Sequence, residues 1–335
     1  MIITKTPFRM SFFGGGTDME SFFKENGGSV LSTTFDKYCY VNVRHLPRFF
    51  DYSTELSYSK TERVTSIDSI EHPAIRNAMK MLDMHEIRLT YEADLPARSG
   101  LGTSSSFAVG MLNAFYALKG KYASKKQLAD EAIYLERVLC DEAGGWQDQI
   151  AASFGGFNRI DFNADGYTVH PVIVSPQRKQ QLNNNLMMFF TGFTRFSSEI
   201  QKANKLDDES KTKQLKQMLT LVDEAESILT DQSKDLDDFG RLLDVTWKLK
   251  RQTGKSVSTS NIDNLYDNGI SAGALGGKLL GAGGGGFLVF YVTPEKQDAV
   301  KEAMKDLLYI PFKFEDSGTQ VIYYGPEDYS PAEVE

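Results

Sequence analysis

At 335 residues the chain is longer than one hydrophobic core usually serves, so its length predicts two domains. Hydrophobic residues make up 41% and charged residues 24% of the sequence, which is the composition of a folded protein and excludes a largely disordered chain. The formal net charge of -8 argues against a nucleic-acid or anionic-membrane partner, because both select basic surfaces.

The cysteine count and the hydropathy pattern favour a cytoplasmic location. Cys39 and Cys140 are too few for a disulfide framework and suit a reducing compartment. The first residues reach Pro, Arg and Gly before a signal-peptide core could form, and the apolar run FLVFYV is far shorter than the roughly 20 residues of a membrane span. The four histidines lack metal-ligand spacing. We therefore expect a soluble, cytoplasmic protein without a membrane partner.

The first part of the chain predicts alternating strands and helices. Ile87, Leu89 and Tyr91 occupy every second position of an apolar run, which is the spacing of a strand. The expected elements are strands at 38–46 and 87–95, helices at 106–119 and 124–140, and a hairpin within 154–174 that turns at Asp165-Gly166.

The later part of the chain predicts a second domain. A charged region carries Met218, Leu221, Val222, Ala225 and Leu229 at helical spacing. Further expected elements are a buried strand in LMMFFTGFT, helices at 235–251 and 261–273, and late strands in FLVFYV and TQVIYYG. We place the boundary near 180, which gives domains 1–180 and 181–335.

The stretch LPARSGLGTSSS, 95–106, separates a predicted strand from a predicted helix. Backbone N–H groups at a helix start are unpaired and the helix dipole favours negative charge there, so together they can bind phosphate. A plain turn is the alternative, but a helix cap needs one hydroxyl rather than four in a row. We expect phosphate binding by Ser99, Gly100, Leu101, Gly102, Thr103, Ser104, Ser105 and Ser106.

Two further glycine-rich loops are less specific by themselves. GAGGGG, 281–286, fits a dinucleotide-binding pattern, but its strand follows the glycines instead of preceding them. It is either a flexible loop or one whose backbone lies against a ligand or against the loop at 99–103. PFRMSFFGGGTD, 7–18, places three glycines before Thr17-Asp18, which is unusual for a mere turn.

Together and in this order, the three loops resemble the three motifs of the GHMP kinase superfamily, with KLLGAGGGGF at 278–287 as the third. More narrowly, FFGGGTD, DKYCYV, GGWQDQ, WKLKR and GGKLLGAGGGG resemble the D-glycero-D-manno-heptose 7-phosphate kinases, with fucokinase domains as relatives. The resemblance implies an α+β fold: a ribosomal-protein-S5-like N-terminal domain, a ferredoxin-like C-terminal domain and an active cleft between them. It also implies ATP and Mg²⁺ as cofactors.

The resemblance further implies catalytic roles. Asp148, in GGWQDQ, matches the base that accepts the proton of a sugar hydroxyl; alternatively it caps a helix or only orients the substrate. Arg9 would keep Asp148 ionised and offset charge on the transferring phosphoryl group. Ser104 and Glu136 match a pair that binds Mg²⁺, although Glu136 by itself reads as a solvated helix residue.

Substrate contacts are implied in the same way. Asp18 stands nine positions after Arg9, as a sugar-binding aspartate does in galactokinase, but Gly15-Gly16 replace the Glu-His of that enzyme and leave space for a longer sugar. An arginine could grip a substrate phosphate, although either candidate could also be an ordinary surface charge. The expected substrate-binding residues are Gly15, Gly16, Thr17, Asp18, Gly284, Arg98 and Arg195.

We therefore expect an ATP-dependent kinase for the anomeric C1 hydroxyl of D-glycero-D-manno-heptose 7-phosphate, whose product is the 1,7-bisphosphate used for nucleotide-activated heptose. Trp146 is closer to fucokinase domains, so an unphosphorylated sugar such as L-fucose is an alternative acceptor. A non-catalytic sensor that binds ATP and sugar is a further alternative, disfavoured by the joint presence of Asp148, Ser104 and Glu136. The oligomeric state stays open, since the acidic helices after 199 could face solvent or a second subunit.

Overall fold

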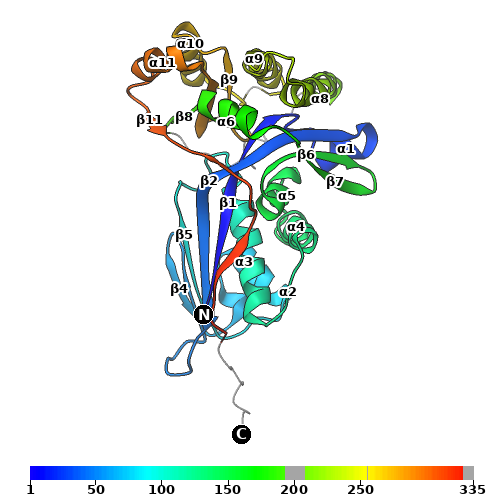
Figure 1. Cartoon of the computed structure of the whole chain (residues 1–335). Coiled ribbons are helices and arrows are strands. Elements are labelled where there is room, and N and C mark those ends of the chain that lie inside the picture. The colour runs from blue at the N-terminus through cyan, green and yellow to red at the C-terminus, as the bar shows by residue number, and fades with distance from the viewer. Residues whose placement is uncertain (193–207, 255, 327–335) are drawn as a thin grey trace.

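A computed structural model describes residues 1–192, 208–254 and 256–326, and two sheets organise this part of the chain (Figure 1). The larger sheet has the order β13-β1-β2-β5-β3-β4, with β6 and β12 also paired to β2 and β7 paired to β6. Its strands are β1 (Ile2–Phe13), β2 (Gly28–His45), β3 (Thr54–Ser57), β4 (Thr61–Val64), β5 (Ile87–Ala93), β6 (Phe157–Asn163), β7 (Gly166–Pro171), β12 (Phe314–Glu315) and β13 (Gln320–Tyr324).

The smaller sheet is antiparallel and has the order β11-β8-β10-β9. Helices separate its first two and last two strands, so the chain runs β-α-β-β-α-β, which is the ferredoxin-like arrangement that the resemblance implies. Its strands are β8 (Leu186–Phe190), β9 (Gly276–Leu279), β10 (Phe287–Tyr291) and β11 (Leu308–Ile310). The expected α+β fold is confirmed.

Helices pack on both faces of the larger sheet near the start of β2, since the neighbouring residues Val30 and Leu31 belong to apolar clusters formed with different helices. The α-helices are α1 (Glu20–Asn26), α2 (Pro73–Met81), α3 (Thr103–Leu118), α4 (Lys125–Tyr134), α5 (Gln147–Phe154), α6 (Pro176–Asn185), α8 (Asp208–Thr230), α9 (Asp237–Arg251), α10 (Ser260–Ser271) and α11 (Gln297–Ala303), with short turns η1 (Ile67–Ser69), η2 (Leu135–Leu139) and η3 (Pro294–Lys296). Within the described ranges, no helix is long and apolar enough to cross a membrane.

Close packing of α3 on β1 positions the loop 99–103, which is the predicted phosphate-binding loop. A Cβ at Gly110 would lie 2.6 Å from Thr6 Oγ1, so only glycine allows the helix to approach the strand this closely. Thr4 Oγ1 donates to the Gly110 carbonyl at 2.9 Å and fixes the contact. The start of α3 therefore lies beside the part of β1 that carries Arg9.

Several expected elements are confirmed and two are corrected. β6 and β7 form the expected hairpin, and Met218, Val222, Ala225 and Leu229 are buried on α8. The strand expected at 38–46 is the end of the much longer β2, whose first part is rich in buried Ser and Thr and lacks an apolar pattern. The helix expected at 124–140 is α4 followed by the π-helical turn η2.

The first strand and the last described strands meet in the larger sheet. β13 pairs antiparallel with β1, and β12 pairs with β2, as Figure 1 shows for β13 beside the first strand. Apolar packing follows the same route, because Phe12 of β1 contacts Phe239 of α9 and Phe314 of β12 with ring centroids 5.4 and 6.5 Å apart. A boundary near 180 stays a prediction, and the last strands return across it.

Candidate active site

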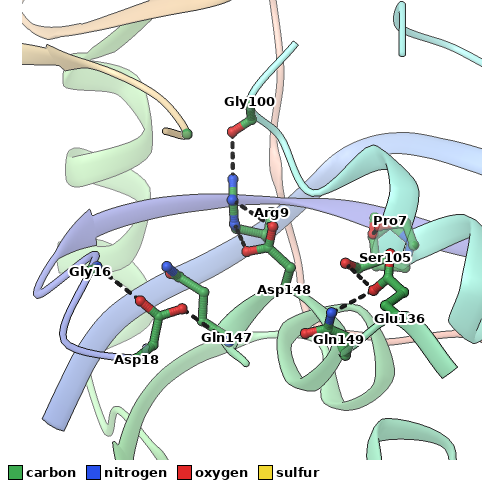
Figure 2. A network of polar contacts seen from close by, with 12 residues as sticks. Pro7, Arg9, Gly16, Asp18, Gly100, Ser105, Glu136, Gln147, Asp148 and Gln149 are labelled. Atoms are coloured by element: carbon green, nitrogen blue, oxygen red, sulfur yellow. Dashed lines mark hydrogen bonds and ion pairs between the residues drawn. The ribbon is translucent and has the colours of Figure 1, made fainter. Parts of the chain in front are cut away.

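Arg9 and Asp148 form a two-pronged ion pair at the centre of the site (Figure 2). Arg9 Nε donates to Oδ1 of Asp148 at 2.7 Å and Nη2 donates to Oδ2 at 2.9 Å. Arg9 Nη1 also donates to the Gly100 carbonyl at 2.6 Å, so the guanidinium joins β1, α5 and the glycine loop. The Arg9 side chain is 5% exposed and that of Asp148 24%, so the carboxylate keeps an open side for a ligand.

The loop before α3 brings its backbone against this pair. Gly100 and Gly102 have φ of 83° and 70°, a left-handed conformation that is strained for any residue with a Cβ atom. Gly102 is also the N-cap residue of α3. A Cβ at Gly102 would lie 3.3 Å from Arg9 Cγ and 3.4 Å from Asp148 Oδ2. The N–H groups at the start of α3, which have no partner within the helix, are thus close to the Asp148 carboxylate.

The predicted phosphate-loop hydroxyls take different directions. Ser104 is exposed, whereas Ser106 Oγ donates to the Pro7 carbonyl at 2.9 Å and Ser105 Oγ donates to Glu136. Thr103 Oγ1 accepts from the Arg98 backbone N–H at 3.3 Å. Ser104 is therefore the hydroxyl of this run that is both exposed and next to a carboxylate, and the nucleotide contacts of the whole run stay predictions.

Glu136 lies in the π turn η2 and is 1% exposed, so it is not a solvated helix residue. Ser104 Oγ donates to Oε1 at 2.8 Å, Ser105 Oγ donates to Oε2 at 2.7 Å, and Gln149 Nε2 also donates to Oε2. In the described ranges, no cluster of three or more His, Cys, Asp or Glu could hold a metal. Glu136 and Ser104 fit Mg²⁺ only as a minority of its ligands, with phosphate and water oxygens supplying the rest.

Asp18 and Thr17 hold the first glycine loop in place. Asp18 accepts from the Gly16 N–H at 2.8 Å and from the Gln147 N–H at 3.3 Å, which joins the loop to the start of α5 (Figure 2). Burial, and then the nearby Asp148 carboxylate, raise the pKa of Asp18 above its ordinary value. Thr17 is fully buried, and its Oγ1 donates to backbone carbonyls of Gly14 and Ser29. The structure thus places Thr17 as a support of the loop.

Gly144 and Gly145 of GGWQDQ leave room for two side chains that approach the backbone closely. A Cβ at Gly145 would lie 1.8 Å from Asp18 Oδ2, and one at Gly144 would lie 2.7 Å from the Arg137 guanidinium. Trp146 packs edge-on against Phe23 with ring centroids 4.8 Å apart. The motif therefore lets Asp18 approach the helix that carries Asp148.

The loop 281–286 lies against the loop before α3, which is one of the alternatives that its sequence leaves open. A Cβ at Gly281 would lie 2.3 Å from Gly100 Cα, and one at Gly286 would lie 2.1 Å from the Ser99 carbonyl oxygen. The Gly284 N–H donates to the Val257 carbonyl at 3.0 Å. Two backbones meet here without side chains between them.

Two lysines at the site have no counterpart in the sequence prediction. Lys250, at the end of α9, donates to the Gly281 carbonyl, and burial followed by the nearby Arg9 lowers its pKa to about 8 while Asp18 and Asp148 oppose that change. Lys278 is 1% exposed and donates to the Phe12 carbonyl at 2.7 Å; burial lowers its pKa well below the usual value. WKLKR and KLLGAGGGG carry both residues, but a lysine in such runs ordinarily reads as a solvated charge.

The two arginines predicted for a substrate phosphate stay predictions. Arg98 is exposed in the loop before α3 and has a φ of 61°. Arg195 lies outside the described residues.

Known proteins with similar sequences include kinases of several small molecules. The chain matches the profile "GHMP kinases N terminal domain" over residues 70–156 and "GHMP kinases C terminal" over 224–310. It is 32% identical to D-glycero-alpha-D-manno-heptose 7-phosphate kinase of Campylobacter jejuni, across 95% of this chain and 98% of that protein. It is 25% identical to L-fucokinase/L-fucose-1-P guanylyltransferase of Bacteroides fragilis, across 89% of this chain and 35% of that protein.

A solved structure supports the fold. The crystal structure of a D-glycero-D-manno-heptose 1-phosphate kinase from Bacteroides thetaiotaomicron matches with a TM-score of 0.78 at 24% identity, across 98% of this chain and 100% of that one.

Proposed function

Because the chain belongs to the GHMP kinase family, we propose that it is an ATP-dependent sugar kinase that phosphorylates the anomeric C1 hydroxyl of D-glycero-D-manno-heptose 7-phosphate. The product is the 1,7-bisphosphate. The observation that carries the proposal is the Arg9–Asp148 ion pair beside the glycine loop that opens α3. This arrangement brings a proton acceptor next to backbone N–H groups suited to phosphate oxygens.

The C1 oxygen attacks the γ-phosphorus, Asp148 accepts the hydroxyl proton, and the bond from the γ-phosphorus to the bridging oxygen breaks to release ADP. Arg9 orients Asp148 through the two-pronged ion pair, and its positive charge offsets the negative charge that develops on the transferring phosphoryl group. The N–H groups at the start of α3 orient phosphate oxygens, since transfer depends mainly on positioning and charge. Bound Mg²⁺, next to Ser104 and Glu136, would neutralise phosphate charge.

Support for the acceptor comes from the Campylobacter jejuni kinase, which is similar over nearly the whole of both chains. Gly15 and Gly16 leave the sugar side of the site without bulky side chains, which suits a seven-carbon sugar. The Bacteroides fragilis relative favours L-fucose as a second candidate, because it shares similarity across 89% of this chain.

The test is ADP release with the purified protein, ATP, Mg²⁺ and each sugar in turn, followed by phosphorus NMR of the product. We expect turnover with heptose 7-phosphate and a phosphorus signal coupled to the anomeric proton. Turnover of free L-fucose but not heptose 7-phosphate would overturn the acceptor. An unchanged Kd for ATP with a loss of about 10²–10⁴ in kcat is expected for Asp148→Asn, because the proton acceptor is removed.

A further inference from the structure

Gln149 is a buried carboxamide of which the protein uses only one end. It follows Asp148 on α5 and is 0% exposed. Its Nε2 donates to Glu136 Oε2, whereas its Oε1 has no hydrogen-bond partner in the described part of the chain. A buried amide oxygen without a donor costs free energy, and a methionine could fill a similar space without that cost. Packing alone therefore does not explain an amide at this position.

The N–H group of Gln149 helps to orient the Glu136 carboxylate. Glu136 Oε2 accepts from Ser105 Oγ at 2.7 Å and from Gln149 Nε2, and both donors belong to buried side chains. Glu136 Oε1 accepts from Ser104 Oγ at 2.8 Å, and Ser104 is exposed. The buried donors thus hold Oε2, which leaves Oε1 as the oxygen on the exposed side, at the start of α3.

The spacing of Ser104 and Glu136 is compatible with two neighbouring ligands of one Mg²⁺. Mg²⁺ is octahedral with oxygen ligands at about 2.0–2.1 Å, so adjacent ligand oxygens lie about 2.9 Å apart. Ser104 Oγ and Glu136 Oε1 are 2.8 Å apart. The serine oxygen keeps lone pairs while it donates its proton to the carboxylate. Both oxygens can therefore face one cation, as long as the carboxylate does not rotate.

Gln149 also joins this carboxylate to the helix of the proton acceptor. Asp148 and Gln149 are consecutive on α5, where Asp148 pairs with Arg9 and Gln149 reaches Glu136 in η2 (Figure 2). Consecutive helical residues are rotated by about 100°, so their side chains point in different directions. One turn of α5 therefore holds both the proton acceptor and Glu136.

Resting on the proposed function, we propose that Gln149 is a positioning residue for Mg²⁺-ATP: its amide N–H holds Glu136 Oε2 and leaves Oε1 to bind the cation beside Ser104. Outer partners of this kind fix the orientation of a metal ligand, and their removal weakens metal binding by roughly 10–100-fold. Gln149 itself contacts neither the cation nor the nucleotide. Its loss should therefore weaken ATP binding only when the cation is present.

Calorimetry tests this inference through the binding of an ATP analogue, without turnover. The Kd of a non-hydrolysable ATP analogue is measured with excess Mg²⁺ and again with EDTA, and the ratio of the two values gives the contribution of the cation. The variants are Gln149→Met, which removes the donor at similar size, and Gln149→Asn, which keeps an amide on a shorter side chain. Thermal unfolding checks that each variant folds.

Asn185→Leu is the matched control. Asn185, at the end of α6, is another buried carboxamide, 3% exposed, and its Nδ2 donates to the Tyr291 hydroxyl at 2.9 Å. Tyr291 belongs to β10 of the smaller sheet. The control therefore loses one buried carboxamide hydrogen bond that involves none of α3, α5 and η2.

We expect Mg²⁺ to tighten analogue binding to the wild type, and both Gln149 variants to lose about tenfold of this effect with an unchanged Kd in EDTA. Asn185→Leu should keep the wild-type ratio. A wild-type ratio in either folded Gln149 variant, or the same loss in Asn185→Leu, overturns the positioning role and leaves the kinase intact. A wild type that shows no Mg²⁺ effect overturns both this role and the predicted metal site. The expected ratios without transfer to any sugar overturn the proposed function alone.

Discussion

At the residue scale, Arg9 makes contacts that a lysine could not reproduce. Its guanidinium pairs with both oxygens of Asp148 and also donates to the Gly100 carbonyl. An ammonium is a point charge that lacks this planar fork, so Arg9→Lys should leave Asp148 less well oriented and the loop less well held. We expect kcat to fall at least about tenfold, which corresponds to roughly 1.4 kcal/mol of transition-state stabilisation.

Arg63→Lys is the matched control for Arg9→Lys, because Arg63 also pairs with a carboxylate but at an exposed position. Steady-state kinetics of both variants with ATP and sugar should show a loss only at Arg9. Equal kcat for Arg9→Lys and the wild type would mean that the fork has no part in catalysis.

Lys250 gives a prediction about pH. With a pKa of about 8 in the folded protein, its ammonium is charged below that pH and loses its proton as the pH rises through it. Positive charge next to the glycine loops should favour the triphosphate, so kcat/KM for ATP should decrease above about pH 8. Lys250→Arg keeps the charge and should abolish this decrease up to pH 9.5 or so, since arginine stays protonated. The same decrease in the arginine variant would assign the titration to another group.

The sequence predicts some of these residues better than others. Arg9 and Asp148 follow from the motifs, and the structure joins them directly. Ser104 and Ser105 cannot be distinguished in a run of hydroxyl residues, because only the rotation of α3 decides that one is exposed and the other buried. The position of Lys250 at the site could not be predicted, because nothing in WKLKR shows which of its two lysines is buried in the fold.

At the element scale, two loops meet backbone to backbone, and this contact depends on Gly100. Gly100→Ala would meet left-handed strain of about 1–2 kcal/mol and, in addition, a Cβ only 2.3 Å from the Leu280 carbonyl oxygen. Moving the loop apart should cost a further 1–3 kcal/mol or so of unfolding free energy. We also expect weaker ATP binding, because the same loop carries the predicted phosphate contacts.

Gly120→Ala separates strain from contact. Gly120 has a φ of 65°, and a Cβ there would meet no atom within 4 Å in the described part of the chain. Chemical denaturation should therefore show a loss of about 1–2 kcal/mol for Gly120→Ala and a clearly larger one for Gly100→Ala. Equal losses would show that the loops separate without cost.

The π turn at Glu136 illustrates what periodicity cannot predict. The run 124–140 has the composition of one continuous helix, but the structure widens it after Tyr134. Glu136 there accepts hydrogen bonds from α3 and α5, partners that are distant in sequence. Tertiary contacts of this kind decide local geometry, and no short window of sequence contains them.

At the scale of the whole molecule, the chain does not divide into independent halves. β13 completes the larger sheet beside β1, and one apolar cluster includes Phe12, Phe157, Phe239 and Phe312 from both parts. Unfolding the later part would expose these aromatic rings and remove an edge strand from the earlier part. Cooperative units share such contacts, so we expect one calorimetric unfolding transition rather than two.

Calorimetry with a bound ATP analogue tests the same expectation of a single unfolding transition. If both loops bind phosphate as one surface, saturating analogue should raise the single transition as a whole, by an amount set by the ligand concentration relative to its Kd. Two resolved transitions, or a shift of only one component, would show that the halves unfold separately despite the shared sheet. Because Gly100→Ala loosens the contact between the loops, it should also broaden or split the transition, whereas Gly120→Ala should lower its midpoint without changing its shape.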